Sequence, residues 1–314
     1  MSRPSTTMQA VLDRLAVEDA GQPDPTTVPP AVGRAQSARN NARWNADLPA
    51  VAEARDIDLD GIPARRIVPA NDRGSDAIFY IHGGGWAFCS PATHEGAARR
   101  LAIACAATVV LPDYRLAPEA PYPAGLDDCE TAWRALPDGV RWSVAGDSAG
   151  ANLAAGLMLR LVAAGQTTPT TALLFYGVFG ADFDTPSYTA FADGPALTRA
   201  KMQHYWDWYA PPDRRGEPFA VPLAATDAQL RALPPVYMNA AGLDPLLSDT
   251  ETLAQRLAEL GRSDVIDVVP GVVHGFMQMG SVLDEAREAF ERAGEFFRRR
   301  SASKGGPAKG GVAT

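Results

Sequence analysis

The stretch RWSVAGDSAGANLAAGLMLRL, residues 141–161, contains the pattern that decides the fold. It begins as a short β-like run and continues, from about Ala149, as a helix of small and apolar residues. Between the two lies GDSAG, residues 146–150, a G-x-S-x-G pattern. At a tight strand-to-helix turn this pattern exposes the serine Oγ on a strained backbone with positive φ, and the flanking glycines avoid a steric clash. The sequence therefore predicts Ser148 as a nucleophile at the end of a buried strand.

The size and charge of the chain exclude several classes of protein. Its 314 residues, 46% of them hydrophobic, suffice for one large α/β domain or two smaller ones. The formal net charge of −8 argues against nucleic acid or an anionic membrane as a partner, because both require a basic surface. No apolar run approaches the roughly 20 residues of a membrane span, and the N-terminus lacks the apolar core of a signal peptide. We expect no stable membrane association and a cytoplasmic location.

The cysteines and the short motifs give no sign of a cofactor. Cys89, Cys105 and Cys129 are widely spaced, without a C-x-x-C pattern and without a histidine in metal-site order. We expect buried free thiols, which is the usual state of such residues. The chain has no P-loop, no G-x-G-x-x-G after a strand and no H-E-x-x-H. No nucleotide, metal or other cofactor is therefore expected.

Short β-branched or aromatic runs alternate with helical patterns along most of the chain. The predicted strands are residues 77–81, 108–111, 142–145, 172–176, 236–240 and 265–269. The predicted helices are residues 93–106, 126–136, 149–164, 250–260 and 283–300. This order predicts an α/β fold with a mostly parallel sheet covered by helices on both faces. The alternating stretch ARDIDLDGIPARRIV, residues 54–68, turns at Asp60-Gly61 and adds an antiparallel hairpin at one edge.

Two segments outside this alternation are expected to form a helical cap over the carboxyl ends of the strands. Residues 1–45 hold a one-sided helix, a proline-rich linker and a second helix; the apolar positions of the first are Met8, Val11, Leu12 and Leu15. Residues 181–235 are rich in proline, aspartate and aromatic residues and show no convincing strand. The hydrolase core then comprises residues 46–180 and 236–300, and residues 301–314 form a low-complexity tail that is expected to be disordered.

A run of three glycines follows the first buried strand, in the segment HGGGW at residues 82–86. Consecutive glycines destabilise regular structure, so we interpret them as bare backbone whose N–H groups form an oxyanion hole with the N–H of Ala149. A flexible turn is the alternative, but it does not explain why the run follows a buried strand. Among the three we favour Gly84 as a donor, with Gly83 or Gly85 as the second.

An acid and a base are predicted at the ends of two later strands. Asp244 follows the strand at 236–240, whereas its competitor Asp249 falls at the expected N-cap of the next helix, where aspartate is favoured for local reasons. A lone histidine is more often structural than catalytic. His274, however, follows the last strand, downstream of the serine and the aspartate, in the order of an α/β-hydrolase triad. The other three histidines fit this role less well: His82, His94 and His204.

Five motifs in order make the chain resemble the bacterial hormone-sensitive-lipase family of α/β-hydrolase esterases, in its GDSAG branch. They are HGGGW, DYRLAPE at residues 113–119, GDSAG, LDPL around Asp244 and HGF at residues 274–276. The resemblance spans about residues 75–300. It implies an eight-stranded α/β-hydrolase fold with a helical cap, a Ser148–His274–Asp244 triad and a glycine-run oxyanion hole. It also implies cofactor-free hydrolysis of short- to medium-chain carboxylic esters through an acyl-enzyme, and a homodimer as a family-level expectation.

Two alternatives to a simple esterase stay open at this point. The same triad could cleave an amide, a carbamate or a lactone, because the serine chemistry is shared. A non-catalytic ligand-binding protein on this fold is the more remote alternative, since it would be expected to lack a triad member or the glycine run. Two departures from the family pattern, at residues 177–180 (GVFG) and at Val221-Pro222, lie near the cap and bear on substrate preference.

Four aromatic residues are candidates for the substrate pocket. Trp86, Phe88 and Phe276 adjoin the catalytic loops, and Trp206 comes from the aromatic stretch at residues 205–209. That stretch cannot face one way on a helix, so part of it should pack the cap instead.

The charges of the second motif, Asp113, Arg115 and Glu119, are expected to serve structure and not the cleft. We interpret them as a buried salt-bridge network that braces the loop under the glycine run, because such pairs retain loop geometry even when they add little stability.

Overall fold

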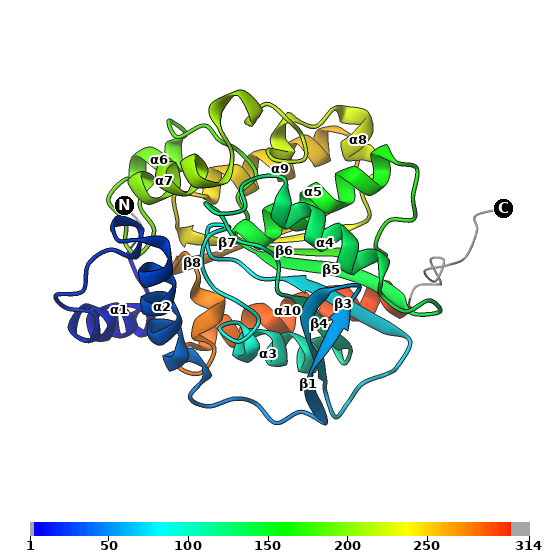
Figure 1. The fold of residues 1–314 in the computed structure, drawn as a ribbon, viewed down its shortest axis with the longest axis horizontal. Coiled ribbons are helices and arrows are strands. Elements are labelled where there is room, and N and C mark those ends of the chain that lie inside the picture. Colours follow the sequence, from blue (N-terminus) through cyan, green and yellow to red (C-terminus); the bar gives the residue numbers. More distant parts are fainter. Residues whose placement is uncertain (1–2, 303–314) are drawn as a thin grey trace.

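The computed structural model describes residues 3–302, so most of the predicted tail lies outside the described residues. Its centre is an eight-stranded sheet with the order β1-β2-β4-β3-β5-β6-β7-β8 (Figure 1). The strands are β1 Glu53–Leu59, β2 Ile62–Val68, β3 Asp76–Ile81, β4 Thr108–Pro112, β5 Arg141–Asp147, β6 Ala172–Phe175, β7 Val236–Leu243 and β8 Val265–Val273. Strands β1 and β2 pair antiparallel, as does β2 with β4, and the remaining pairs are parallel. The predicted mostly parallel sheet with an antiparallel edge hairpin is therefore confirmed.

Helices cover both faces of this sheet (Figure 1). They are α3 Glu95–Cys105, α4 Ala124–Arg134, α5 Ala149–Ala163, α9 Leu247–Glu259 and α10 Asp284–Ala302. Successive side chains of a strand point to opposite faces, so Phe79 of β3 packs in one apolar cluster with α4, α5 and α9. Its neighbours Ile78 and Tyr80 pack in a second cluster with α3 and α10. The sheet is thus buried on both sides, which explains why its central strands read as continuous apolar runs.

The segments predicted to form the cap are helical. The N-terminal segment contains α1 Thr6–Glu18, α2 Pro30–Asn41 and the 3₁₀ turns Pro25–Thr27 and Ala42–Asn45. The insertion between β6 and β7 contains α6 Pro186–Ala190, α7 Arg199–Tyr209, α8 Asp227–Arg231 and the 3₁₀ turns Pro212–Arg214 and Pro222–Ala224. The two segments are joined by an ion pair between Lys201 Nζ and Asp24 Oδ2 at 3.1 Å. Helix α1 also braces the core, because the Ser5 N–H donates to the Gly271 carbonyl and Met8 is fully buried.

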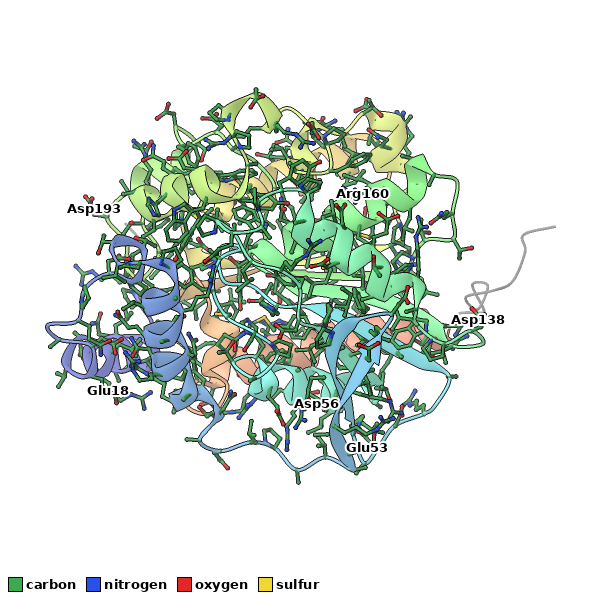
Figure 2. The ribbon with its side chains drawn as sticks, viewed as in Figure 1. Glu18, Glu53, Asp56, Asp138, Arg160 and Asp193 are labelled. Atoms are coloured by element: carbon green, nitrogen blue, oxygen red, sulfur yellow. The ribbon has the colours of Figure 1, made fainter. Side chains whose placement is uncertain are left out.

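Several charged side chains connect neighbouring elements, among them Arg160, which is labelled in Figure 2. Arg160 of α5, for example, pairs with Asp127 at 2.6 Å and with Glu130 at 3.1 Å, both on α4. Two of the three cysteines, Cys105 and Cys129, are buried free thiols as predicted, whereas Cys89 is partly exposed. No helix of residues 3–302 is long and apolar enough to cross a membrane.

Candidate active site

Ser148 stands at the turn between β5 and α5, where the sequence predicts it. Its backbone has φ 54° and ψ −121°, a strained conformation for a residue with a side chain. The tightness of the turn requires both flanking glycines. A Cβ on Gly146 would lie 2.3 Å from the Gly150 carbonyl oxygen, and one on Gly150 would lie 2.1 Å from that of Ile81. The serine is therefore held by a turn that only the observed glycines can close.

Three side chains from distant parts of the chain meet in series at this turn. His274 Nε2 lies 2.9 Å from Ser148 Oγ, and His274 Nδ1 lies 2.7 Å from Asp244 Oδ2. The other carboxylate oxygen of Asp244, which is 1% exposed, accepts the N–H of Leu246 at 2.9 Å. With the imidazole proton on Nδ1, this series leaves Nε2 free to accept the serine proton. The arrangement can activate Ser148 as a nucleophile.

The strands that carry the acid and the base are longer than predicted. Strand β7 reaches Leu243 and β8 reaches Val273, with a register shift between Ala241 and Leu243. Asp244 and His274 consequently follow these strands directly, without an intervening loop. Tyr176, which sequence reasoning did not assign to the site, presents its ring to the imidazole of His274 with the centroids 5.0 Å apart.

The glycine run lies beside Ser148, but its members are not equivalent. Gly84 and Gly85 have φ of 116° and 59°, conformations that favour glycine. The N–H of Gly83 instead donates to Asp147 Oδ1 at 3.0 Å, so Gly83 does not fit the predicted donor role. Ala149 is the first residue of α5, where a backbone N–H has no partner within the helix. Gly84, Gly85 and Ala149 therefore remain as the candidate oxyanion donors.

A buried polar cluster of Asp147, Tyr80 and His94 holds the start of the glycine run through the bond to Gly83. Asp147 Oδ1 also accepts the Tyr80 hydroxyl at 2.9 Å, and Asp147 Oδ2 lies 3.4 Å from His94 Nε2. Burial opposes ionisation of Asp147, but His94 and Tyr80 outweigh it and hold the pKa of this carboxyl below its usual value. His82 stacks on Tyr114 with the ring centroids 4.3 Å apart, and burial lowers its pKa to about 3. The contacts of His82 and His94 are those of structural residues.

The N-cap role predicted for Asp249 is wrong. Helix α9 begins at Leu247, so Asp249 lies in its first turn with the carboxylate directed inward. Asp249 Oδ2 accepts the N–H groups of Phe179 at 2.9 Å and Gly180 at 2.8 Å. Burial raises the pKa of this carboxyl to about 7, and the nearby charge of Asp244 acts in the same direction. Asp249 thus anchors the loop after β6 and has no hydrogen bond to His274.

The four aromatic residues predicted for the pocket are all buried. Trp86 stacks on Tyr209 at 4.1 Å between centroids and contacts Trp206 at 4.8 Å, so both tryptophans pack α7 against the glycine run. Phe88 packs against Tyr205 and Trp208, and Phe276 packs against Tyr176. Tyr205 lies directly against the last glycine of the run, since a Cβ on Gly85 would lie 2.7 Å from its ring. A pocket role for Trp86, Phe88, Trp206 and Phe276 stays a prediction.

The charges expected to form one network belong to separate pairs, so the predicted network is wrong. Arg115 pairs with Asp128 at 2.7 Å, and Glu119 pairs with Arg34 of α2. Asp113 has no ion pair among the described residues, and burial raises its pKa. Arg34 also donates to the carbonyls of Ala87 and Ala117, each at 2.8 Å. The loop after the glycine run is therefore braced from the N-terminal segment.

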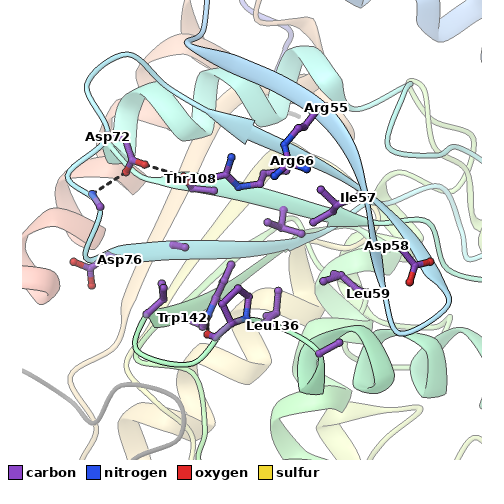
Figure 3. Close-up of a pocket in the computed structure, with 16 residues that line it drawn as sticks. Arg55, Ile57, Asp58, Leu59, Arg66, Asp72, Asp76, Thr108, Leu136 and Trp142 are labelled. Atoms are coloured by element: carbon purple, nitrogen blue, oxygen red, sulfur yellow. Dashed lines mark hydrogen bonds between the residues drawn. The ribbon is translucent and has the colours of Figure 1, made fainter.

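A separate cavity of about 440 Å³ lies at the amino ends of the strands, where β3, β4 and β5 begin, on the side of the sheet away from Ser148 (Figure 3). Trp142, Leu136 and Ile57 form part of its apolar lining, and Arg55 and Arg66 lie on the β1–β2 side. Both arginines pair with Glu53. This cavity does not contact the residues around Ser148. Within residues 3–302, no group of three or more His, Cys, Asp or Glu is arranged to hold a metal ion.

Comparisons with known proteins agree with this geometry. Residues 78–278 match a family model described as alpha/beta hydrolase fold. The chain is 37% identical over 257 residues to carboxylesterase NlhH of Mycobacterium tuberculosis, covering 76% of this chain and 80% of that protein. It is 33% identical over 241 residues to an ethyl acetate hydrolase of Pseudomonas putida, covering 72% and 75%.

Solved structures of hydrolases are similar to this one over most of the chain. The structure is similar to an α/β hydrolase from the metagenome of Lake Arreo, with a TM-score of 0.89 and 32% identity over 96% of this chain and 99% of that one. It is also similar to a thermostable esterase from Pseudomonas putida ECU1011, with a TM-score of 0.86 and 30% identity over 95% and 98%.

Proposed function

This chain belongs to the hormone-sensitive-lipase family of α/β-hydrolase esterases and hydrolyses carboxylic esters, and we propose that Ser148, His274 and Asp244 carry out the reaction. The observation that carries the proposal is the series of two short contacts, 2.9 Å from Ser148 Oγ to His274 Nε2 and 2.7 Å from His274 Nδ1 to Asp244 Oδ2. Each contact joins a nucleophile or a base to the group that must activate it.

The mechanism is acyl transfer in two steps. As Ser148 Oγ attacks the ester carbonyl, its proton passes to His274 Nε2, and Asp244 stabilises the resulting imidazolium through Nδ1–H. The imidazolium then protonates the leaving alcohol, and water repeats the sequence to release the acid. The oxyanion of each tetrahedral intermediate is held by the N–H groups of Gly84, Gly85 and Ala149. Such a donor contributes a factor on the order of 10²–10³ in rate.

Replacement of the nucleophile tests the proposal. Ser148→Ala is expected to lower kcat for p-nitrophenyl butyrate by about 10⁴–10⁶ without changing the melting temperature. Circular dichroism of both proteins is the control for folding. If the purified variant kept more than a tenth of the wild-type rate, Ser148 would not be the nucleophile.

We further propose that residues 1–45 and 181–235 cap the site and limit it to short- and medium-chain acyl groups. The ion pair between Asp24 and Lys201 and the contact of Tyr205 with Gly85 support this, because they hold the cap directly over the glycine run. A panel of p-nitrophenyl esters from acetyl to decanoyl, with a matched anilide, measures the preference. Equal kcat/KM across the panel would contradict the proposed limit, and equal ester and anilide rates would identify an amidase.

A homodimer is proposed through the exposed edge strand β8. Its outer residues Val265, Ile266 and Val268 are 38–42% exposed, and an edge strand presents unpaired backbone groups to a second copy. Ile266→Lys is expected to convert the dimer into a monomer in light scattering after size exclusion. A wild-type protein that is monomeric at every concentration would refute this proposal. A cytoplasmic location stays a prediction.

A further inference from the structure

Asn152 is a buried asparagine that sequence reasoning did not assign to the site. It lies on α5, one helical turn beyond Ser148, and is 0% exposed. The signal for it was present in the sequence, since it is the one polar residue in the helix stretch ANLAAGLML at residues 151–159. Burial of an amide inside such a helix is costly unless every polar atom finds a partner.

The carboxamide of Asn152 finds all of its partners outside α5. Its Oδ1 accepts the indole N–H of Trp86 at 3.2 Å. Its Nδ2 donates to the carbonyls of Val178 at 3.0 Å and Ala220 at 2.8 Å. Two acceptors face the nitrogen and one donor faces the oxygen, so only one orientation of the amide satisfies them. One side chain thereby connects the glycine run, the loop after β6 and the cap insertion to the helix that follows the nucleophile.

The bond to Trp86 fixes the end of the glycine run. Trp86 directly follows Gly85 and has φ 58°, a left-handed conformation that persists only where the surroundings hold it. Its ring is held by Tyr209 and Trp206 of α7 on the cap side, and its indole N–H is held by Asn152 on the core side. The positions of the Gly84 and Gly85 N–H groups relative to Ser148 therefore depend on this bond.

The bond to Val178 closes a small ring around the nucleophile. The N–H of Val178 donates to the carbonyl of Ser148 at 3.3 Å, and the backbone N–H of Asn152 donates to the same carbonyl at 3.2 Å. The Val178 carbonyl in turn accepts from the Asn152 side chain. The side-chain amide of Asn152 thus links the nucleophile and the oxyanion donors through hydrogen bonds.

We propose that Asn152 is a positioning residue that sets the glycine N–H donors at the distance from Ser148 that the oxyanion requires. The inference rests on the proposed function and specifies how its oxyanion hole is built. The oxyanion forms only in the transition state, so loss of this alignment lowers kcat and leaves KM nearly unchanged. A misplacement of about 1 Å in such a site can cost a factor of about 10² in rate.

Two variants remove different numbers of the hydrogen bonds that the Asn152 side chain makes. Asn152→Ala removes all three side-chain hydrogen bonds, whereas Trp86→Phe removes the indole donor and part of the ring system but keeps an aromatic ring. We expect Asn152→Ala to lower kcat for p-nitrophenyl butyrate by about 30- to 100-fold, with KM within about threefold of wild type. Trp86→Phe should lower kcat by about tenfold, and the double variant should lose less than the product of the two effects, because both changes remove the same bond.

A matched control separates positioning from loss of stability. Asn239 of β7 is also 0% exposed, but its side chain donates to Asp267 of β8 and has no hydrogen bond to the glycine run or to Ser148. Asn239→Ala should lower the melting temperature while kcat stays within about twofold of wild type. A trifluoromethyl ketone forms an adduct that mimics the tetrahedral intermediate. Its inhibition constant should rise in Asn152→Ala by the same factor by which kcat/KM falls.

The outcomes distinguish this proposal from the proposed function itself. A fluorophosphonate should still label Ser148 stoichiometrically in every variant, whereas failure to label the wild type would refute the proposed function. The positioning role is overturned if kcat of Asn152→Ala stays within twofold of wild type, or if KM rises while kcat is constant. It is also overturned if Asn239→Ala loses as much kcat. If Asn152→Ala does not fold, an unchanged kcat in Trp86→Phe is sufficient to overturn the positioning role.

Discussion

The buried carboxylate of Asp249 makes a quantitative prediction about pH and stability. Asp249 is 2% exposed, and burial raises its pKa from 3.8 to about 7. Between these two values the folded protein holds a proton that the unfolded chain releases. The free energy of unfolding therefore falls as the pH rises through this window and is level above it.

The size of the effect follows from the same two values. Linkage gives a loss of about 2–3 kcal/mol of unfolding free energy between pH 5 and pH 8 from this one group. Asp249→Asn removes the titration and keeps an oxygen that can accept the N–H groups of Phe179 and Gly180. The variant should therefore be more stable than wild type at pH 8, and its advantage should shrink by about 2–3 kcal/mol at pH 5.

Urea unfolding of both proteins at a series of pH values between 5 and 8 measures this difference directly. Curves for wild type and Asp249→Asn that run parallel across the range would refute the reasoning. The same variant tests the choice between the two carboxylates. Asp249→Asn should retain kcat within a few-fold, whereas Asp244→Asn should lose a factor of about 10⁴, because the imidazole then adopts the wrong tautomer.

Substitutions at three further positions test the site and its supports. Gly85→Ala places a Cβ 2.7 Å from the Tyr205 ring at φ 59°, so kcat/KM for p-nitrophenyl butyrate should fall by about 10²; an unchanged value would exclude Gly85 from the oxyanion hole. Arg34→Ala leaves the Ala87 and Ala117 carbonyls without their guanidinium donor, so the free energy of unfolding should fall by about 1–3 kcal/mol. An unchanged midpoint of urea unfolding would contradict this. Tyr205→Ala removes the ring that lies against Gly85 and should raise kcat/KM for decanoyl relative to butyryl esters, whereas Tyr205→Phe should not; equal ratios in both would show that Tyr205 does not limit the acyl chain.

Much of the fold was predictable because local sequence and tertiary structure agree. The G-x-S-x-G pattern and the glycine run each depend on backbone geometry close to the residues themselves. Ser148, Asp244 and His274 all follow parallel strands of one sheet, and the carboxyl ends of these strands lie on the same side of the sheet. Their convergence therefore follows from topology, and the distances of 2.9 and 2.7 Å agree with it.

The errors concern partners that only the folded chain brings together. The sequence predicts a local N-cap role for Asp249, but its carboxylate accepts N–H groups of Phe179 and Gly180, about seventy residues earlier in the chain. Arg115 and Glu119 are close in sequence, yet each pairs with a residue of another segment. Charge and spacing do not specify which of several ion-pair partners is within reach.

The central claim is that the hydroxyl of Ser148 is activated by His274 and Asp244. Fluorophosphonate labelling followed by peptide mass mapping tests it most directly. The wild type and Asp249→Asn should carry one adduct, on Ser148, formed at similar rates. His274→Ala and Asp244→Asn should label far more slowly. An adduct on another residue, or an undiminished labelling rate in His274→Ala, would contradict the account.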